Sequence, residues 1–204
     1  MKILSYIKGD RVIWMIVLLL SVVSILAVYS SIGALAYRYR SGNTLGYLTK
    51  HAGIIALGIY LMYLIHKMKY IYFSRISQIG VFVAAPLLLF TLLKGVSAGE
   101  ANRWLEIHGL GMTFQTSDFA KLVLIGYVAR VLSLKQDTIK DLKEGFLPIV
   151  IPVTIICALI FPANFSTAAL LFVTCMVLMF IGRVNIKHML VLMGSGIIVI
   201  AIIG

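Results

Sequence analysis

The stretch GFLPIVIPVTIICALIFPANFSTAALLFVTCMVLMFIG, residues 145–182, contains 38 residues without a charged side chain. A helix needs about 20 apolar residues to cross a bilayer, so this stretch is close to two crossings in length. Its middle, residues 162–167, contains a proline, an asparagine and two hydroxyl side chains, which favour a turn. Because backbone polar groups must be satisfied inside a membrane, we expect this break to line a cavity or to pack on protein.

The composition of the whole chain is typical of a membrane protein. Of its 204 residues, 61% are hydrophobic and 12% are charged, and the mean hydropathy is +1.05. Soluble proteins contain about 25% charged residues. The net charge of +11 does not indicate nucleic-acid binding, because the basic residues are scattered between apolar segments and form no stripe. Cys157 and Cys175 lie in apolar segments, where we expect burial as small hydrophobic residues and no disulfide.

Charged and polar residues divide the chain into six apolar spans and part of a seventh. The sequence therefore predicts an all-α polytopic membrane protein, folded as a helical bundle. The spans are predicted at residues 12–36, 52–65, 76–93, 114–134, the two halves of 145–182, and from 189 onward. We expect Pro86 to kink the third span. The seventh span reaches Gly204 without a flanking charge, which predicts that the chain is the N-terminal part of a longer protein.

The basic residues predict the orientation of the chain in the membrane. With the N-terminus in the cytoplasm, the inner segments hold 12 Lys and Arg residues and the outer segments hold 6. Cytoplasmic loops are enriched in Lys and Arg, so this asymmetry predicts a cytoplasmic N-terminus. Residues 99–111 and 163–167 then lie outside. Residues 133–145, which mix Lys with Asp and Glu, are expected to form a solvated inner loop.

The outer segment between the third and fourth spans holds the first candidate binding residues. Arg103 and Trp104 lie between the acidic residues Glu100, Glu106 and Asp118. An Arg–Trp pair at an interface could bind a phosphate or stack on a sugar, because a guanidinium forms bidentate hydrogen bonds with phosphate. The alternative is that Trp104 is an aromatic anchor at the membrane surface and that Arg103 pairs with a lipid headgroup.

A polar run, QTSDFAK, opens the fourth span. Thr116 or Ser117 could cap this helix, and Asp118 in its first turn suits the positive end of the helix dipole. Asp118 and Lys121 are three residues apart and could pair on one face. These roles would explain the polar run on structural grounds alone. An ionisable side chain at membrane depth, however, has a high free-energy cost, and such residues usually have a function. Gln115, Asp118 and Lys121 are therefore candidates for substrate binding.

Asn164, Ser166 and Thr167 in the break are the remaining candidates. They could hydrogen-bond a substrate, or they could serve only as a polar hinge and helix N-cap. His108 is expected to be a loop residue, because no second His, Cys or carboxylate lies at metal-ligand spacing from it. The sequence contains no phosphate-binding glycine loop, zinc motif or nucleophilic-serine motif.

Three segments carry a resemblance to a known family. Residues 101–105 read ANRWL, residues 114–121 read FQTSDFAK, and residues 161–168 read FPANFSTA. They are similar to G-x-x-R-W, F-Q-P-S-E-F-x-K and P-D-x-G-T-A, which occur in this order and spacing in the SEDS family (FtsW, RodA, SpoVE). The resemblance covers the chain from about Tyr29 onward. We refer to these segments as the first, second and third motifs.

The chain departs from the family's motifs at four positions. Thr116 replaces a proline, Asp118 replaces a glutamate, Asn164 stands near an aspartate, and Ser166 replaces a glycine. The change at Asp118 keeps the negative charge. The change at Asn164 removes one, which argues against any role that requires a carboxylate there. The missing aspartate and the sequence of residues 28–31 favour the FtsW division branch over RodA.

The resemblance implies a fold and an activity. Members of the family are ten-span membrane glycosyltransferases of cell wall biogenesis, cell division and cell shape. They polymerise the lipid-linked peptidoglycan precursor lipid II into glycan strands, with a class B penicillin-binding transpeptidase as partner. By this resemblance, residues 1–204 would be the N-terminal part of a single SEDS domain in the bacterial inner membrane, beside other divisome membrane proteins. The family's catalytic aspartate follows the seventh span, beyond Gly204, so we expect no catalytic residue and no activity from this chain alone.

The resemblance also implies roles for the charged candidates. Cationic groups would stabilise the leaving pyrophosphate, with Arg103 and Lys121 in this position. No cofactor is assigned, although a divalent cation such as Mg²⁺ would suit the polymerase reaction. Broken helices and paired intramembrane charges are also typical of a lipid-precursor flippase or other transporter. A scaffold that recruits a partner through its outer loop is a weaker alternative. An outer-loop aspartate in the remaining half would favour the enzyme, and an inverted repeat would favour the transporter.

Overall fold

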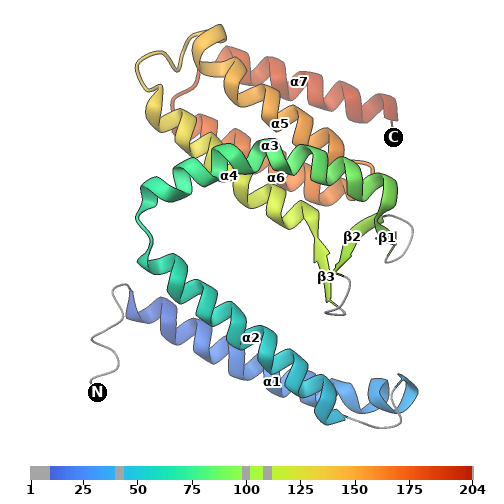
Figure 1. Ribbon diagram of the computed structural model, residues 1–204. Helices are drawn as coiled ribbons and strands as arrows, with labels where there is room; N and C mark the ends of the chain where they lie inside the picture. Colours follow the sequence, from blue (N-terminus) through green and yellow to red (C-terminus); the bar gives the residue numbers. More distant parts are fainter. Residues whose placement is uncertain (1–9, 40–43, 98–101, 108–111, 204) are drawn as a thin grey trace. The chain divides into compact units, whose positions relative to one another are not determined.

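The computed structural model describes residues 10–39, 44–97, 102–107 and 112–203. These residues form seven α-helices, one short π-helix (η2) and a three-stranded sheet (Figure 1). The elements are α1 Arg11–Tyr39, α2 Thr44–Lys67, α3 Tyr70–Lys94, β1 Val96–Ser97, β2 Asn102–Ile107, β3 Met112–Gln115, α4 Thr116–Leu134, η2 Leu142–Phe146, α5 Leu147–Ile160, α6 Phe165–Ile181 and α7 Ile186–Ile203. The predicted helical architecture is confirmed, apart from the sheet.

Several helices have the length and composition of membrane spans. Within the described residues, four segments meet both conditions: Arg11–Ser31, Leu45–Lys67, Tyr70–Lys94 and Leu142–Ile160. α6 is also apolar but has 17 residues, and α4 carries three charged side chains. The chain is thus a multi-pass membrane protein, and the count of six spans and part of a seventh stays a prediction. Pro86 lies inside α3, which continues to Lys94, and a kink there is likewise a prediction.

The chain divides into two compact units, Met1–Lys69 and Tyr70–Gly204. In the first unit α1 packs on α2. Ser24 Oγ and His51 Nε2 are hydrogen-bonded at 3.0 Å, which links the two helices. Hydroxyl and imidazole side chains often join helices in this way in membranes. The predicted second span, residues 52–65, is too short, because the helix extends back to Thr44 through His51, which has this partner in α1.

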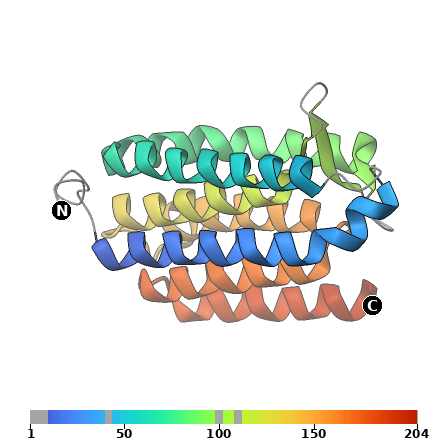
Figure 2. The same cartoon turned by 90° about the horizontal axis from the view of Figure 1, so that it is seen from below.

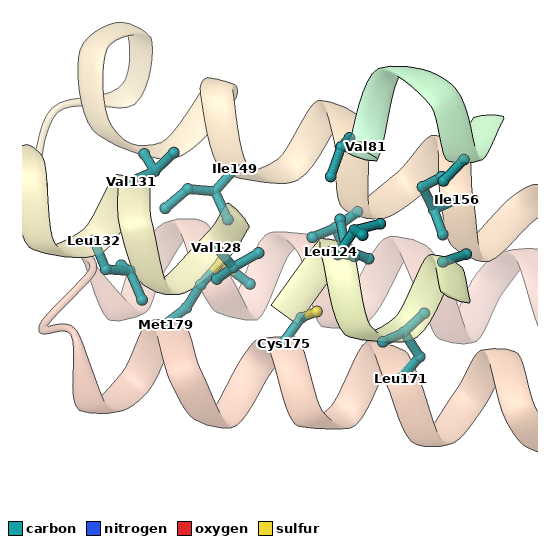
Figure 3. Close-up of a cluster of buried hydrophobic side chains, with 14 of the residues drawn as sticks. Val81, Leu124, Val128, Val131, Leu132, Ile149, Ile156, Leu171, Cys175 and Met179 are labelled. Atoms are coloured by element: carbon teal, nitrogen blue, oxygen red, sulfur yellow. The ribbon is translucent and has the colours of Figure 1, made fainter. Parts of the chain in front are cut away.

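The core of the second unit lies around α4. Ala120, Leu124 and Val128 recur every four residues along one face of this helix, and none of them is exposed. Side chains of α3, α5 and α6 pack against this face (Figure 3). The free cysteines belong to the same region, Cys175 buried in α6 and Cys157 half-buried in α5.

Two glycines allow α3 and α4 to approach each other closely. A Cβ on Gly80 would lie 2.6 Å from Cγ1 of Val123, and a Cβ on Gly126 would lie 3.0 Å from Cβ of Ser77. Lipid tails are as apolar as leucine, so helices in a membrane gain most from close van der Waals packing. Small residues at this contact therefore stabilise the pair, and they hold the first half of α3 against the middle of α4.

The segment between α4 and α5 differs from the predicted solvated loop. Its charged side chains are exposed, apart from the half-buried Lys135, but Ile139 and Phe146 are buried. Nζ of Lys135 donates a hydrogen bond of 2.6 Å to the carbonyl oxygen of Glu144, and the ring of Phe146 lies 5.2 Å from that of His188 in α7. The prediction is wrong for Ile139, which is buried inside the predicted loop. Together with Phe146, directly after the loop, it anchors the segment to the core.

Candidate functional site

One end of the second unit brings parts of all three motifs together, and we refer to it as the hairpin end. β2 and β3 form an antiparallel hairpin in which Trp104 pairs with Gln115 and Leu105 with Phe114. α4 begins directly after β3, at Thr116. The turn between α5 and α6 lies at the same end of the unit (Figures 1 and 2). The predicted helical start at Phe114 is wrong, because Phe114 and Gln115 belong to the hairpin.

Sequence reasoning missed the hairpin. Its signal is weak: two short runs of mixed apolar and polar residues, at 102–107 and 112–115, are separated by a segment that contains Gly109 and Gly111. Such a pattern is typical of two strands joined by a glycine-containing connection. The apolar spans on either side are much longer, and their strong helical signal obscures the two short strands. Residues 108–111, which include His108, and residues 98–101, which include Glu100, lie outside the described residues.

A small cleft connects the second and third motifs. Its polar lining comes from Thr116 and Ser117 of α4, Asn164 of the α5–α6 turn and Thr91 of α3, and its apolar lining from Leu88, Leu92, Leu159, Ile160 and Ala163. The cleft encloses about 20 Å³. That volume suffices for about one water molecule and is far too small for a sugar ring. The cleft therefore holds these segments together and is not itself a substrate cavity.

The cleft includes a residue that sequence reasoning did not select. Thr91 is 2% exposed, as is Thr116, and its Oγ1 donates a hydrogen bond of 2.8 Å to the carbonyl oxygen of Leu87. The available signal was a single hydroxyl within the apolar run LLLFTLL at the end of the third span. Threonine hydroxyls in membrane helices commonly bond a carbonyl of their own helix, so nothing in the sequence assigned Thr91 to a site. Only the packing of α3 on α4 identifies it.

Asn164 has the capping role that the break predicts. It precedes α6 in an extended conformation, with φ −158° and ψ 92°, and its Oδ1 accepts a hydrogen bond of 3.1 Å from the backbone N–H of Thr167. Its own N–H donates to the carbonyl oxygen of Ile160 at 2.8 Å. Asn164 thus ends one helix and starts the next. Ser166 is exposed, and neither Ser166 nor Thr167 lines the cleft.

The prediction that Thr116 or Ser117 caps α4 is wrong. The residue before the helix is Gln115, and its side chain forms no capping hydrogen bond. Instead, Nε2 of Gln115 donates a hydrogen bond of 3.0 Å to Oγ of Ser117. The physical reason is the hairpin: β3 passes directly into α4, so Thr116 and Ser117 already lie inside the helix and are buried.

The predicted ion pair is confirmed. Nζ of Lys121 lies 2.7 Å from Oδ1 of Asp118. Asp118 occupies the first turn of α4, where the positive end of the helix dipole favours a carboxylate. The side chains are 31% exposed for Lys121 and 57% for Asp118, so the pair contributes at most about 1 kcal/mol to stability. An ammonium has three donors, which leaves Lys121 two for an anion.

The first motif is described only in part. Arg103 lies on β2, but its side chain is outside what the structure describes. Trp104 is half-buried on the same strand. Among the described residues, no three His, Cys, Asp or Glu side chains gather in one place. At the hairpin end Asp118 is the one carboxylate among the described side chains, and it is paired with Lys121. These residues do not fit a cage for a divalent cation.

A comparison with known families agrees with the motifs. The family model of the FtsW, RodA and SpoVE proteins, described as cell cycle proteins, matches residues 10–204. The chain therefore belongs to this family.

Individual relatives extend the comparison. The chain is 32% identical over 190 residues to the probable peptidoglycan glycosyltransferase FtsW of Bacillus subtilis strain 168, an overlap of 90% of this chain and 46% of the relative. It is 25% identical to the stage V sporulation protein E of the same organism, and this overlap covers 88% of this chain and 49% of the relative. It is 24% identical to the probable peptidoglycan glycosyltransferase FtsW of Wigglesworthia glossinidia brevipalpis, covering 91% and 48%. The chain spans about half the length of these curated relatives. No solved structure matches it.

Proposed function

We propose that this chain is part of a peptidoglycan glycosyltransferase that polymerises lipid II into glycan strands at the division septum. Two relatives carry the name of this activity, and both are FtsW proteins. The supporting observation in the structure is the meeting of the second and third motifs at one cleft, beside the Asp118–Lys121 pair. Such an arrangement holds the first turn of α4, and Asp118 in that turn positions the Lys121 ammonium through the ion pair.

The proposed reaction transfers a glycosyl group between two lipid-linked molecules. An acceptor hydroxyl attacks the anomeric carbon of the donor, and the bond from that carbon to the pyrophosphate oxygen breaks. The pyrophosphate leaves with the bonding electrons, and a general base takes the hydroxyl proton. The base is proposed to be an aspartate beyond Gly204. Lys121, with two donors free of Asp118, would stabilise the negative charge on the leaving pyrophosphate, with Arg103 as a second cation.

The buried polar residues would act through Lys121. Thr116 and Ser117 precede it in α4, and Asn164 closes the other side of their cleft. Their hydroxyl and amide groups lie where the cleft admits a single water molecule. We propose that Thr116, Ser117 and Asn164 are positioning residues. Trp104, Gln115, Ser166 and Thr167 stay candidates for contacts with the sugars.

The remaining assignments are proposals of the same kind. The protein would lie in the bacterial inner membrane with its N-terminus in the cytoplasm, and its partners would be a class B penicillin-binding transpeptidase and other divisome membrane proteins. Residues 1–204 would form part of a single domain. A divalent cation such as Mg²⁺ would have to be held mainly by the substrate pyrophosphate, because the described residues offer no cage for it.

The test is polymerisation of fluorescent lipid II by the purified full-length protein, read out on a gel that separates glycan strands by length. Lys121→Met should lower the rate at least about 100-fold, as expected for the loss of a charge-stabilising donor. Lys94→Met is the matched control, since Lys94 ends α3 at the same end and is exposed. It should retain the parent rate. Equal rates for the parent and Lys121→Met would contradict the role of Lys121.

Two further measurements separate the polymerase from the transporter and locate the base. The 204-residue chain alone should form no glycan strands. Product from this chain would place the base within it. In vesicles, the full-length protein should polymerise lipid II. If it moves lipid II across the bilayer and makes no strands, the transporter alternative is correct.

A further inference from the structure

The end of the second unit opposite the hairpin carries a surplus of positive charge, and we refer to it as the basic end. It holds seven basic residues and three acidic ones, Asp137, Asp141 and Glu144. The basic residues are Arg75, Arg130, Lys135, Lys140, Lys143, Arg183 and Lys187. In the part of the chain that the structure describes, none of these cations lies within 4.0 Å of a carboxylate, and the ion pair that does form is at the hairpin end.

Contacts between the helices bring these residues to one end. A guanidinium N–H of Arg130 in α4 donates a hydrogen bond to Oγ of Ser74 in α3, next to Arg75. The end of α4 also touches the end of α6: a Cβ on Gly182 would lie 2.6 Å from Cδ2 of Leu132. Figure 1 shows the start of α3, the end of α4 and the turn between α6 and α7 at this one end of the unit.

Arg183 has an unusual backbone conformation. It follows α6 directly after Gly182, and its φ is 61°. The N–H of Val184 bonds the carbonyl oxygen of Met179 at 3.1 Å, which is the pattern of a helix that ends in a left-handed residue. Glycine usually occupies that position, because a side chain there is strained. A strained non-glycine residue that is retained in a structure points to a function for its side chain.

An exposed apolar surface lies beside these cations. Ile181 and Ile186 flank the turn that contains Arg183, and they are 69% and 58% exposed. The side chain of Lys187, which follows Ile186, is also exposed and has no partner in the described part of the chain. Cations at the ends of membrane helices, next to an apolar wall, match the phosphate and the acyl chains of a phospholipid.

We propose that Arg183 and Lys187, at the turn between α6 and α7, bind the headgroup phosphate of an anionic phospholipid whose acyl chains lie along the exposed ends of these helices. A guanidinium can bind a phosphate through two hydrogen bonds, and the ammonium adds a second charge. An acidic protein segment would also satisfy the cations but would leave the apolar surface uncovered. The proposal does not depend on the glycosyltransferase activity.

The first test compares lipids. The full chain is placed in nanodiscs of phosphatidylcholine alone or of equal parts phosphatidylcholine and phosphatidylglycerol, and bound phosphatidylglycerol is measured by native mass spectrometry. Phosphatidylglycerol should bind the parent chain in preference to phosphatidylcholine, and less so at high salt. The double variant Arg183→Gln, Lys187→Gln should bind it about 25-fold more weakly, at about five-fold for each lost charge. Lys94→Gln, at the hairpin end, should bind as the parent does.

Three results would overturn the proposal. The parent could bind the two lipids equally, the double variant could lose nothing, or Lys94→Gln could lose as much as the double variant. If an oligoglutamate peptide binds the parent and the double variant loses that binding while lipid preference is absent, the surface serves an acidic protein segment instead.

The variant Arg183→Gly adds a measurement that a purely structural role cannot reproduce. Glycine relieves the left-handed strain but removes the charge. In phosphatidylcholine, Arg183→Gly should therefore raise the midpoint of thermal unfolding above that of the parent. In the mixed nanodiscs, the extra rise that phosphatidylglycerol gives to the parent should shrink by at least half. A variant that keeps the full extra rise would show that Arg183 does not bind the lipid.

Discussion

The two ends of the second unit differ in how their charged side chains are paired. At the hairpin end, Lys121 is paired with Asp118 at 2.7 Å, and buried hydroxyls of Thr91 and Thr116 line a cleft beside the start of the same helix. At the basic end there are seven cations and three carboxylates, and no ion pair forms there among the described residues. One helix, α4, connects the two ends through the core.

The difference indicates what each end can bind. A paired and positioned ammonium has few orientations, which suits one charged group of a specific substrate. Exposed cations without partners keep their rotamer freedom, which suits a mobile anionic surface such as lipid headgroups. Arg183 differs from the other cations of the basic end in its backbone. Its left-handed conformation is fixed by the hydrogen bonds that end α6.

The largest expected effect concerns which end faces the cytoplasm. In a background with Cys157→Ala and Cys175→Ala, a cysteine at Thr113 or at Gln136 tests the two ends, since both positions are exposed. A membrane-impermeant maleimide should modify Thr113→Cys in intact cells, and Gln136→Cys only after permeabilisation. The reason is the surplus of Lys and Arg at the basic end. The reverse pattern would invert the topology and place the basic end outside.

Removing the charges of Asp118 and Lys121 at the hairpin end should have the next largest effect, measured as complementation by the full-length protein. Asp118→Asn leaves Lys121 unpaired near hydrocarbon, which should lower the yield of membrane-inserted protein. Adding Lys121→Met removes the lone charge and should restore the yield. Complementation should stay absent if Lys121 stabilises the leaving pyrophosphate. Its recovery in the double variant would reduce the pair to a structural role.

A side chain at Gly145 should break the anchoring of the basic end. Its Cβ would lie 2.6 Å from the carbonyl carbon and Cα of Ile139, and backbone atoms cannot move aside as a flexible side chain can. Gly145→Ala should cost about 1–3 kcal/mol of unfolding free energy, measured by denaturation in detergent. Gly58→Ala in α2 is the control, because its Cβ would meet nothing within 4 Å. Equal stability of the two variants would show that this segment is not fixed to the core.

The smallest effect is expected from the cap of α6. Asn164→Ala removes the acceptor for the N–H of Thr167 and should lower the unfolding free energy by about 1 kcal/mol. Asn164→Asp keeps an acceptor and should match the parent in stability. Comparing their polymerisation rates in the full-length protein sharpens the assignment. If Asn164→Asp is as stable as the parent but loses activity, the neutral amide serves the substrate as well as the helix.

Local patterns in the sequence predicted the features that depend on neighbours in the chain. Runs without charge located the helices, although the starts of α2, α3 and α4 were misplaced: α3 begins at Tyr70, ahead of the predicted start at residue 76. A three-residue spacing predicted the Asp118–Lys121 pair, and Asn164 after a proline predicted the N-cap. These features follow from helix geometry, in which residues three or four apart share a face. The roles of these residues toward a substrate are still predictions.

The sequence did not reveal the features that depend on segments distant in the chain. The lining of the cleft by Thr91 requires α3, α4 and the α5–α6 turn to meet. The hairpin of β2 and β3 has only a weak local signal, and its strand β2 also contacts α3 and α4. Likewise, nothing in the run FIGRVN indicates that Arg183 is left-handed, since glycine precedes it and would be the expected residue there. The contact of Gly182 with Leu132 helps to explain this order, because a side chain at position 182 would press on α4.

The sequence by itself determined that this protein is helical, that it spans a membrane several times, and that it belongs with the FtsW, RodA and SpoVE proteins. Short motifs indicate the family. The length of the hydrophobic runs predicts membrane helices, because a helix in lipid must form all its backbone hydrogen bonds within itself. Tertiary structure decided which polar groups meet at the cleft and which of the described cations at the basic end have no carboxylate partner. In a bilayer, apolar surfaces gain little from avoiding lipid, so close packing of small side chains such as Gly80 and Gly126 selects the helix contacts. That fit exists only once the helices are side by side.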